Sequence, residues 1–226
     1  MFDWITRVIA EGVLQTIRTT LVMSLFSTFI SSFLGIIIGL SLERYQFLGK
    51  SIIIRINRTM MGVPPVVIGL VVYLLLMRQG PLGFLSALFT IQGMIFAQVL
   101  IITPIISSMI HSYSVRTAAE IRVFARTMGA NKRQTAFLVL REMRHEIYFV
   151  MLTGFGRAIS EVGAVMLVGG NIRGSTRTMT TAITMLRNQG IFYEGILLGV
   201  TLLVLAFILQ SVVDGIRKKD EVFENY

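Results

Sequence analysis

Long apolar runs without a charged residue alternate with short polar segments along this chain. In chain order, five such runs cover residues 19–42, 59–77, 89–110, 147–170 and 195–213, and the fourth of them is interrupted by charged side chains. About 20 apolar residues suffice for a helix to cross the hydrocarbon core of a bilayer. The pattern predicts an all-α, polytopic membrane protein with about five transmembrane helices in a single domain, residues 1–226.

The polar segments between the runs carry local signals of their own. Pro64 and Pro65 stand near the start of the second run and are expected to kink or break that helix. Residues 78–88, rich in Gly and Pro, are expected to form a turn. Residues 43–58 read as a polar connector with amphipathic stretches, and residues 171–189 as a polar loop. A short helix is expected in that loop from the helical spacing of Met179, Ala182, Ile183 and Leu186.

The first eleven residues do not resemble a signal peptide, because Asp3 is acidic and no small-residue cleavage site follows. They are expected to form a short helix at the membrane surface, with Phe2, Trp4 and Ile5 entering the lipid.

Residues 112–146, here called the elbow, form the longest polar interruption and predict two short helices. The first is expected over residues 115–128, capped by Ser114 and ended by Gly129 in a left-handed conformation. Apolar residues three and four positions apart place one stripe on this helix, formed by Ala118, Ile121, Ala125 and Met128.

The second helix of the elbow is expected to begin at Asn131, with Gln134 placed to complete a capping box. The elbow is strongly basic through Arg116, Arg122, Arg126, Lys132, Arg133, Arg141 and Arg144. A solvated loop explains most charge runs. Two caps, a hinge glycine and an apolar stripe instead favour a rigid lever that a soluble partner grips.

Composition supports a membrane protein and narrows its chemistry. The chain is 54% hydrophobic and only 15% charged, with mean hydropathy +0.75, whereas globular proteins carry about a quarter charged residues. The net charge of +9 is explained by basic loops rather than by nucleic acid. The absence of cysteine excludes disulfides, Cys-ligated metals and thiol catalysis. His111 and His145 are isolated, so neither a metal site nor catalysis is expected.

A nucleotide site is not expected in this chain. Residues 49–51 read Gly-Lys-Ser, but Arg44 stands where a phosphate-binding loop requires glycine. We therefore expect no enzyme activity and no cofactor bound by this chain.

The distribution of basic residues predicts the orientation. With five spans, one side receives Arg44, Lys50, Arg55, Arg58, the elbow cations, Arg217, Lys218 and Lys219, and the other receives Arg7, Arg18, Arg78, Arg173, Arg177 and Arg187. The side richer in Lys and Arg is cytoplasmic. The N-terminus is therefore expected outside, and the elbow and the C-terminus inside.

Two groups of residues are candidates for the pathway. Arg157 and Glu161 are four apart on one expected helix face, so they form either a structural ion pair or a guard beside an anion path. Gly154, Gly156 and Gly163 allow close helix approach around them. The loop with Asn171, Arg173 and Arg177 is either an ordinary outer loop or an anion-attracting mouth built from backbone amides and guanidinium groups. A role as an outer gate or as a docking site for a partner protein is expected rather than stable anion binding. Pro64 and Pro65 are either a simple kink or part of a central gate.

The elbow resembles the cytoplasmic motif of the membrane subunits of binding-protein-dependent ABC importers. That motif is Glu-Ala-Ala, three residues, Gly, nine residues, then Ile-x-Leu-Pro. Here Ala125 and Gly129 match and Val139 replaces Ile, while Val123, Phe124 and the pair Arg141-Glu142 differ.

The run Gly-Arg-Ala-Ile-Ser-Glu-Val-Gly-Ala at residues 156–164, with Gly-Gly-Asn-Ile at 169–172 and Thr-Arg-Thr at 176–178, resembles the oxyanion branch of that family. This branch comprises the molybdate, sulfate and tungstate permeases, and the residues of these motifs most resemble those of the tungstate permeases. The resemblance extends from about residue 12 onward.

The resemblance implies a MetI-like permease core in the cell membrane, working as a homodimer with an ATPase subunit and an extracytoplasmic oxyanion-binding protein. The cargo would be tungstate, with molybdate or sulfate as alternatives. A self-sufficient secondary transporter or channel, and a membrane scaffold that transports nothing, are the rivals from other classes. The residues expected to couple to the ATPase are Arg116, Glu120, Ala125, Met128, Gly129, Ala130 and Arg133. The residues expected at the pathway or gate are Pro64, Pro65, Arg157, Glu161, Asn171, Arg173 and Arg177.

Overall fold

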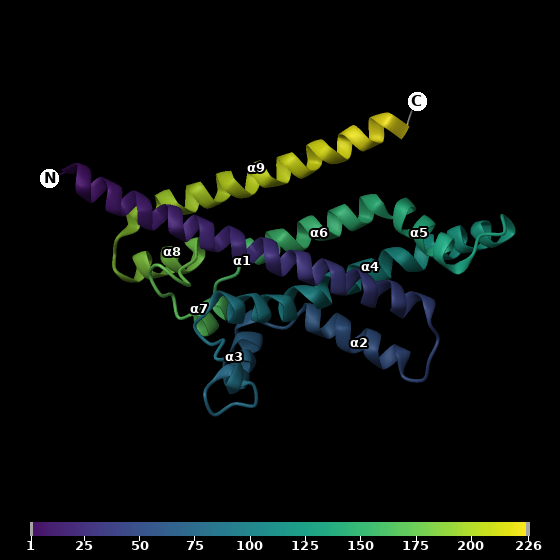
Figure 1. The fold of residues 1–226 in the computed structure, drawn as a ribbon, viewed down its shortest axis with the longest axis horizontal. Helices are drawn as coiled ribbons and strands as arrows, with labels where there is room; N and C mark the ends of the chain where they lie inside the picture. The colour runs from purple at the N-terminus through teal and green to yellow at the C-terminus, as the bar shows by residue number, and fades with distance from the viewer. Residues whose placement is uncertain (1, 225–226) are drawn as a thin grey trace.

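The computed structural model describes residues 2–224, with side-chain detail for residues 12–211, and its regular elements are all helical (Figure 1). The helices are α1 (Phe2–Arg44), α2 (Lys50–Met61), α3 (Pro65–Leu76), the 3₁₀ turn η1 (Gly83–Leu85), α4 (Ile91–Thr127), α5 (Lys132–Glu142), α6 (Arg144–Ile159), α7 (Gly163–Gly169), α8 (Met179–Asn188) and α9 (Phe192–Glu224).

Three continuous helices within α1, α4 and α9 are long and apolar enough to cross a membrane. Two bent pairs, α2 with α3 and α6 with α7, bring the number to five if each pair is one span. The expectation of about five spans is therefore consistent with the structure, and the helix expected around Met179 is confirmed as α8.

The inner face of α1 is set by small hydroxyl side chains rather than by its largest apolar ones. Thr20, Ser24, Ser27 and Ser31 are fully buried at helical spacing, whereas bulky residues such as Phe29 are exposed. Small residues let neighbouring helices approach closely. A Cβ added at Gly35 would lie 2.6 Å from Ile106 Cγ2 of α4. The backbone of α1 therefore packs directly against a side chain of α4 at this position.

The second apolar run is broken rather than gently kinked. Helix α2 ends at Met61 with Gly62 as its C-cap, α3 begins with Pro65 at its first position, and the two axes differ by 103°. Proline at a first helical position loses no hydrogen bond, and the residue before a proline disfavours the helical region. The break expected at Pro64 and Pro65 is therefore confirmed, and the connector expected over residues 43–58 is helical from Lys50.

Helix α4 runs without interruption from the membrane into the elbow, so the separate helix expected over residues 115–128 is wrong in its start. The Ser114 hydroxyl does not cap a helix but donates to the carbonyl of His111, 3.1 Å away, inside α4. The Ser112 hydroxyl likewise donates to the carbonyl of Ser108 at 2.9 Å. Serines satisfied within the preceding turn can continue a helix, and here they carry α4 through a polar segment.

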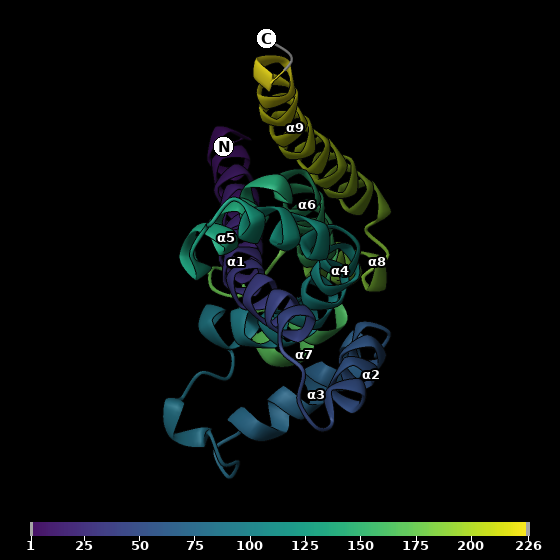
Figure 2. The ribbon, with the colours of Figure 1, turned by 90° about the vertical axis from the view of Figure 1, so that its right-hand side faces the viewer.

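Helix α9 lies along the outside of the bundle, against α6 and α8 (Figure 2). Most side chains of residues 192–211 are exposed or only half-buried in this chain. Figure 1 shows the elbow and the end of α9 at one end of the molecule and the start of α1 at the other. This arrangement agrees with an odd number of crossings; which end is cytoplasmic remains a prediction.

Residues 2–11 continue α1 rather than forming a helix of their own. The side chains of Phe2, Trp4 and Ile5, expected to enter the lipid, lie outside the part of the chain whose side chains the structure describes.

Candidate functional site

The turn of the elbow is fixed by local hydrogen bonds on both sides of Gly129. Gly129 has φ 74°, and the amide of Ala130 donates to the carbonyl of Ala125 at 2.9 Å, which is the bond of a Schellman motif. Asn131 Oδ1 then accepts from the Gln134 amide at 2.9 Å while Gln134 Oε1 accepts from the Asn131 amide at 2.8 Å. The predicted left-handed glycine and capping box are both confirmed, and they join α4 to α5 with few free torsions.

The inner face of the elbow packs on the membrane helices. Ala118, Val139 and Met143 form a buried apolar cluster, against which Leu40 of α1 and Ile121 of α4 also pack. Burial of apolar side chains is the main source of helix docking energy. The elbow is therefore attached to the ends of α1 and α6, and not a solvated loop.

An ion pair that the sequence does not reveal ties the elbow to the first span. Arg122 of α4 meets Glu43 of α1 with both guanidinium nitrogens, Nη1 to Oε1 at 2.6 Å and Nη2 to Oε2. The two side chains are only 20% and 10% exposed. Bidentate pairs of this kind fix orientation as well as distance. The one sequence signal was an acidic residue at the end of a span that faces a basic segment.

The outer face of the elbow is apolar at its tip. Phe124 is 61% exposed and Met128 73% exposed, with Val123 and Phe137 also exposed nearby. Met128 was expected on one apolar stripe with Ala118, Ile121 and Ala125 and instead lies outside it, because α4 ends at Thr127 and Met128 is its C-cap. Exposed apolar residues gathered on a surface of this kind mark an interaction site.

The residues predicted to couple to a partner divide into two groups. Arg116, Glu120, Met128, Gly129 and Arg133 are exposed and available for contact. Ala125 is 1% exposed and packs inward, while Ala130 is half-buried at the turn. Ala125 and Gly129, the two residues that match the family motif, thus shape the turn, and other residues form the surface that a partner can contact.

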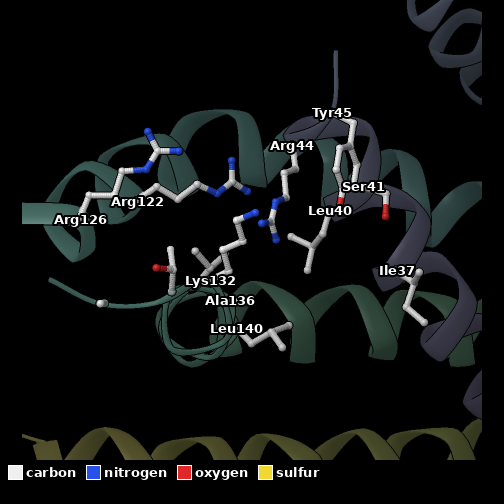
Figure 3. A pocket seen from close by; sticks show the side chains of 13 residues that line it. Ile37, Leu40, Ser41, Arg44, Tyr45, Arg122, Arg126, Lys132, Ala136 and Leu140 are labelled. Carbon is white, nitrogen blue, oxygen red and sulfur yellow. The ribbon is translucent and has the colours of Figure 1, made fainter. Parts of the chain in front are cut away.

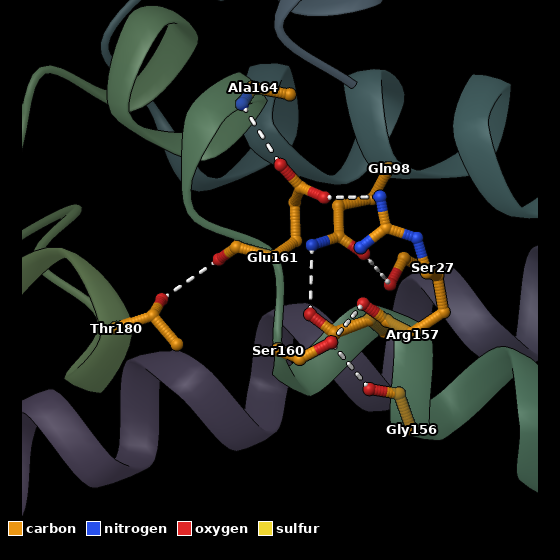
Figure 4. A network of polar contacts seen from close by, with 9 residues as sticks. Ser27, Gln98, Gly156, Arg157, Ser160, Glu161, Ala164 and Thr180 are labelled. Carbon is orange, nitrogen blue, oxygen red and sulfur yellow. Dashed lines mark hydrogen bonds and ion pairs between the residues drawn. The ribbon is translucent and has the colours of Figure 1, made fainter. Parts of the chain in front are cut away.

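The fourth span is broken at Ser160–Val162, and Glu161 connects the two pieces (Figure 4). Its Oε2 pairs with Arg157 Nη2 at 2.9 Å, and its Oε1 accepts from the Ala164 amide at 3.1 Å. The predicted pair is confirmed, but not on one continuous helix face, because α6 has ended at Ile159 and α7 starts at Gly163, bent by 58°. Glu161 is thus both an ion-pair partner and an acceptor for an otherwise free amide in the first turn of α7.

Polar side chains from other helices hold this break in place. Gln98 of α4 donates to the Ala158 carbonyl at 3.0 Å and lies 3.4 Å from the Ser27 hydroxyl of α1. Thr180 of α8 donates to the Glu161 carbonyl at 2.8 Å. Glu161 is 4% exposed, whereas the Arg157 side chain is 33% exposed. A buried carboxylate with a partly open guanidinium beside it presents positive charge outward.

The two broken spans meet near their breaks. A Cβ added at Gly69 of α3 would lie 2.6 Å from the Ala164 Cα of α7, and Gly163 stands against Val66. Pro64 and Pro65, just before Val66, are therefore brought to the same region as the start of α7. Of the three glycines predicted to permit close packing, Gly154 and Gly163 do so, while Gly156 has open space around it.

The loop after α7 is folded around its own polar groups. Asn171 has φ 52°, and Arg177 donates through Nε to Asn171 Oδ1 at 3.2 Å and through Nη2 to the Asn171 carbonyl at 3.4 Å. Burial, and then the positive charge of Arg173, lower the pKa of Arg177 from its usual value, although a guanidinium stays protonated. Arg173 is exposed, and Gln15 of α1 donates to the Gly174 carbonyl at 2.5 Å. The loop is an ordered, cationic surface rather than a closed anion cage.

Comparison with known proteins agrees with these features. Residues 31–219 match the family described as binding-protein-dependent transport system inner membrane component. The tungstate uptake system permease protein TupB of Peptoclostridium acidaminophilum is 41% identical over 82% of this chain and 80% of its own length. The probable anion ABC transporter permease protein of Haloferax volcanii is 40% identical over 89% of this chain and 88% of its own.

Among solved structures, an inward-facing conformation of the MetNI methionine ABC transporter superposes with a TM-score of 0.57 over 97% of this chain and 99% of the matched chain. The sequence identity is 16%, so this likeness concerns the fold, and it supports the MetI-like core. With the family match covering most of its length, the chain belongs to the inner membrane components of binding-protein-dependent transport systems.

Proposed function

We propose that this chain is the membrane-spanning subunit of an ABC importer that brings an oxyanion, tungstate, into the cell. The 41% identity to a tungstate uptake permease over most of both chains supports this cargo. The chain would carry no catalytic site. Energy would come from ATP and Mg bound to a separate ATPase subunit.

In this proposal two copies of the chain enclose the path, and a protein outside delivers the anion. The elbow of each copy projects into the cytoplasm and contacts one ATPase subunit. The excess of Lys and Arg at the elbow end supports this orientation. The exposed Phe124 and Met128 supply the apolar contact, and the exposed Arg116 and Arg133 supply charge around it.

Helix α4 would transmit the movement. It runs from the elbow tip at Thr127 back to Gln98, about 45 Å along its axis, without a chain break. Gln98 contacts the carbonyl of Ala158, two residues before the break of the fourth span. Because one helix joins the docking surface to that break, displacement of the tip by a closing ATPase dimer would shift α6 relative to α7.

The Arg157–Glu161 pair would serve as the guard of the path. While the path is empty, Glu161 neutralises Arg157 at 2.9 Å. Movement of α7 would draw Glu161 away, because the same carboxylate is bonded to the Ala164 amide. Arg157 would then attract the anion for a moment without binding it tightly, as transport requires. Arg173 and Arg177 would act earlier, at the outer gate or in docking the delivering protein.

The observation that carries the proposal is the continuity of α4 from the membrane to an apolar, rigidly capped tip. Its test is the double variant Phe124→Ser with Met128→Ser, in proteoliposomes holding this chain, its ATPase and its binding protein. We expect loss of ATPase co-purification and at least a tenfold fall in ATP-dependent tungstate uptake. Phe84→Ser is the matched control, since Phe84 is 79% exposed but belongs to η1 rather than the elbow.

If the double variant retains both ATPase co-purification and ATP-dependent tungstate uptake, the elbow does not couple this chain to the ATPase. Uptake that needs neither ATP nor ATPase would instead favour a secondary transporter or channel. For the cargo, molybdate and sulfate should compete with tungstate only at much higher concentrations once the binding protein is present; equal competition would replace the tungstate assignment with a broader oxyanion one.

A further inference from the structure

A cleft of about 500 Å³ lies between the end of α1, the end of α4 and the inner side of α5. Four basic side chains line it, from three separate helical segments: Arg44, Arg122, Arg126 and Lys132. Figure 3 shows Arg44, Arg122 and Lys132 pointing toward the same space between the helices. The cleft plays no part in the transport mechanism above.

The positive charge in this cleft is only partly neutralised. Arg122 is paired with Glu43, and Arg44 lies over the ring of Tyr45 at 5.6 Å. Among the described residues, Arg126 and Lys132 have no carboxylate partner. Cations gathered in one cleft repel each other, and an anion placed between them removes that cost. Arginine and lysine side chains in such an arrangement suit a phosphate group, which accepts several charge-assisted hydrogen bonds.

One wall of the cleft is apolar and continues along the membrane span. Ile37 and Leu40 of α1 line it. Ile37 is 49% exposed, and on the same face of α1, four and eight positions earlier, Phe33 and Phe29 are 63% and 71% exposed. Residues four apart share a helix face. An apolar strip therefore leads from the lipid-crossing part of α1 directly into the basic cleft, at the point where the span ends.

We propose that this cleft binds the phosphate-bearing headgroup of an anionic phospholipid, with its acyl chains lying along the Phe29–Phe33–Ile37 face of α1. A free phosphate would use the same cations but has no use for the apolar strip, so the strip favours the lipid. Basic pockets at the ends of transmembrane helices are suited to such headgroups.

The bound lipid would not compete with the ATPase for the elbow. Arg126 and Phe124 are two positions apart on α4, and residues two apart point about 200° away from each other around a helix. The cleft thus opens on the side of α1, while the exposed tip faces away from it. The lipid headgroup would join α1, α4 and α5 at one point and stiffen the elbow that the partner grips.

The test uses the full chain, purified in neutral detergent, with native mass spectrometry to count retained phosphatidylglycerol and phosphatidylcholine. We expect selective retention of phosphatidylglycerol. The double variant Arg126→Gln with Lys132→Gln should weaken it by roughly thirtyfold, the effect of removing two cations near an anionic headgroup. The matched control, Arg133→Gln with Arg141→Gln, removes the same charge from exposed positions on α5 that do not line the cleft.

Charge-conserving exchange, Arg126→Lys with Lys132→Arg, should restore retention and so distinguish lost charge from misfolding. Glycerol 1-phosphate and inorganic phosphate, added at millimolar concentration, should neither displace the lipid nor raise the unfolding temperature. Equal losses in the double variant and its control would overturn the site. Equal stabilisation by the soluble phosphates would overturn the lipid as its occupant.

Discussion

Arg122 and Glu43 are 79 positions apart in the sequence, and their side chains meet through two parallel contacts at the base of the elbow. This pair joins the end of the first span to the helix that carries the docking tip. A lever needs a fixed point near its base, and the pair lies one and a half turns before the tip of α4. The two parallel contacts fix the orientation of the Arg122 guanidinium, which the single charge of a lysine ammonium group would not do.

The Glu43→Gln variant should loosen the elbow while leaving the rest of the bundle folded. Glutamine keeps the size of the side chain but leaves the partly buried Arg122 without its counter-charge. We expect the free energy of opening of the elbow to fall by about 2 kcal/mol. Amides of residues 118–143 should then exchange with deuterium roughly thirtyfold faster where exchange follows the opening equilibrium.

Glu142→Gln is the control for this experiment, since Glu142 is an exposed acid on α5 within the same elbow. Its exchange rates should match those of the unaltered chain. The same rates in Glu43→Gln would show that the pair contributes nothing to the attachment of the elbow.

Gly129→Ala should uncouple ATP hydrolysis from transport, and Gly49→Ala should not. Both glycines have a left-handed backbone, with φ 74° and 86°, and a Cβ would meet nothing within 4 Å at either. Each substitution therefore costs about 1 kcal/mol of local backbone strain. Only Gly129 lies in the turn between α4 and α5. We expect more ATP to be consumed per anion imported in Gly129→Ala, measured in proteoliposomes; an equal change in Gly49→Ala would contradict the special role of the elbow turn.

The parts of this structure that depend on local chemistry could be predicted from the sequence. The apolar runs indicated the spans, and Asn131 and Gln134 indicated the start of α5. The 103° angle at Pro64 could not be predicted, because proline interrupts a helix without fixing its new direction. The continuity of α4 was hidden because serines at its polar segment are indistinguishable in sequence from those of a loop.

Contacts in the candidate site that join segments far apart in the sequence could not be predicted either, for a different reason. Gln98 and the carbonyl of Ala158 are 60 positions apart, and their meeting depends on how α4 packs against α6. Arg157 and Glu161 could be paired from their spacing alone, but the helix break between them could not. A Ser-Glu-Val-Gly sequence indicates neither where α6 ends nor that Glu161 accepts from the first turn of α7.

Substitutions at Arg157 and Glu161 should have unequal effects on stability. Arg157→Gln leaves the carboxylate of Glu161, 4% exposed, without a counter-charge, and breaking a buried pair in this way costs about 3 kcal/mol. Glu161→Gln leaves a guanidinium that is 33% exposed, and its amide oxygen can still accept from Ala164, so we expect a loss of about 1 kcal/mol.

The measurement is the midpoint of chemical unfolding in detergent for both single variants and the double one. Arg157→Gln with Glu161→Gln should be more stable than Arg157→Gln alone, because no buried charge remains. The same double variant should lose transport if the pair guards the path. A double variant that is stable and transports normally would leave the pair with a structural role only.

The contact between α3 and α7 should be sensitive to a single added methyl group. At Gly69 a Cβ would lie 2.6 Å from Ala164 Cα and 3.0 Å from Ala164 Cβ. The first of these atoms is backbone and cannot turn aside, so Gly69→Ala must push α3 and α7 apart, at a cost of about 1 to 3 kcal/mol. Because α7 begins next to Glu161, we expect lower stability together with altered transport.

Ala164→Gly, added to Gly69→Ala, should recover only part of the loss, since it removes the Cβ clash but not the Cα one. Gly156→Ala is the matched control, with open space around its site, and should unfold like the original chain. If Gly69→Ala unfolds at the same denaturant concentration as Gly156→Ala, then the two broken spans do not meet as described, and the displacement of α7 loses its route to the second span.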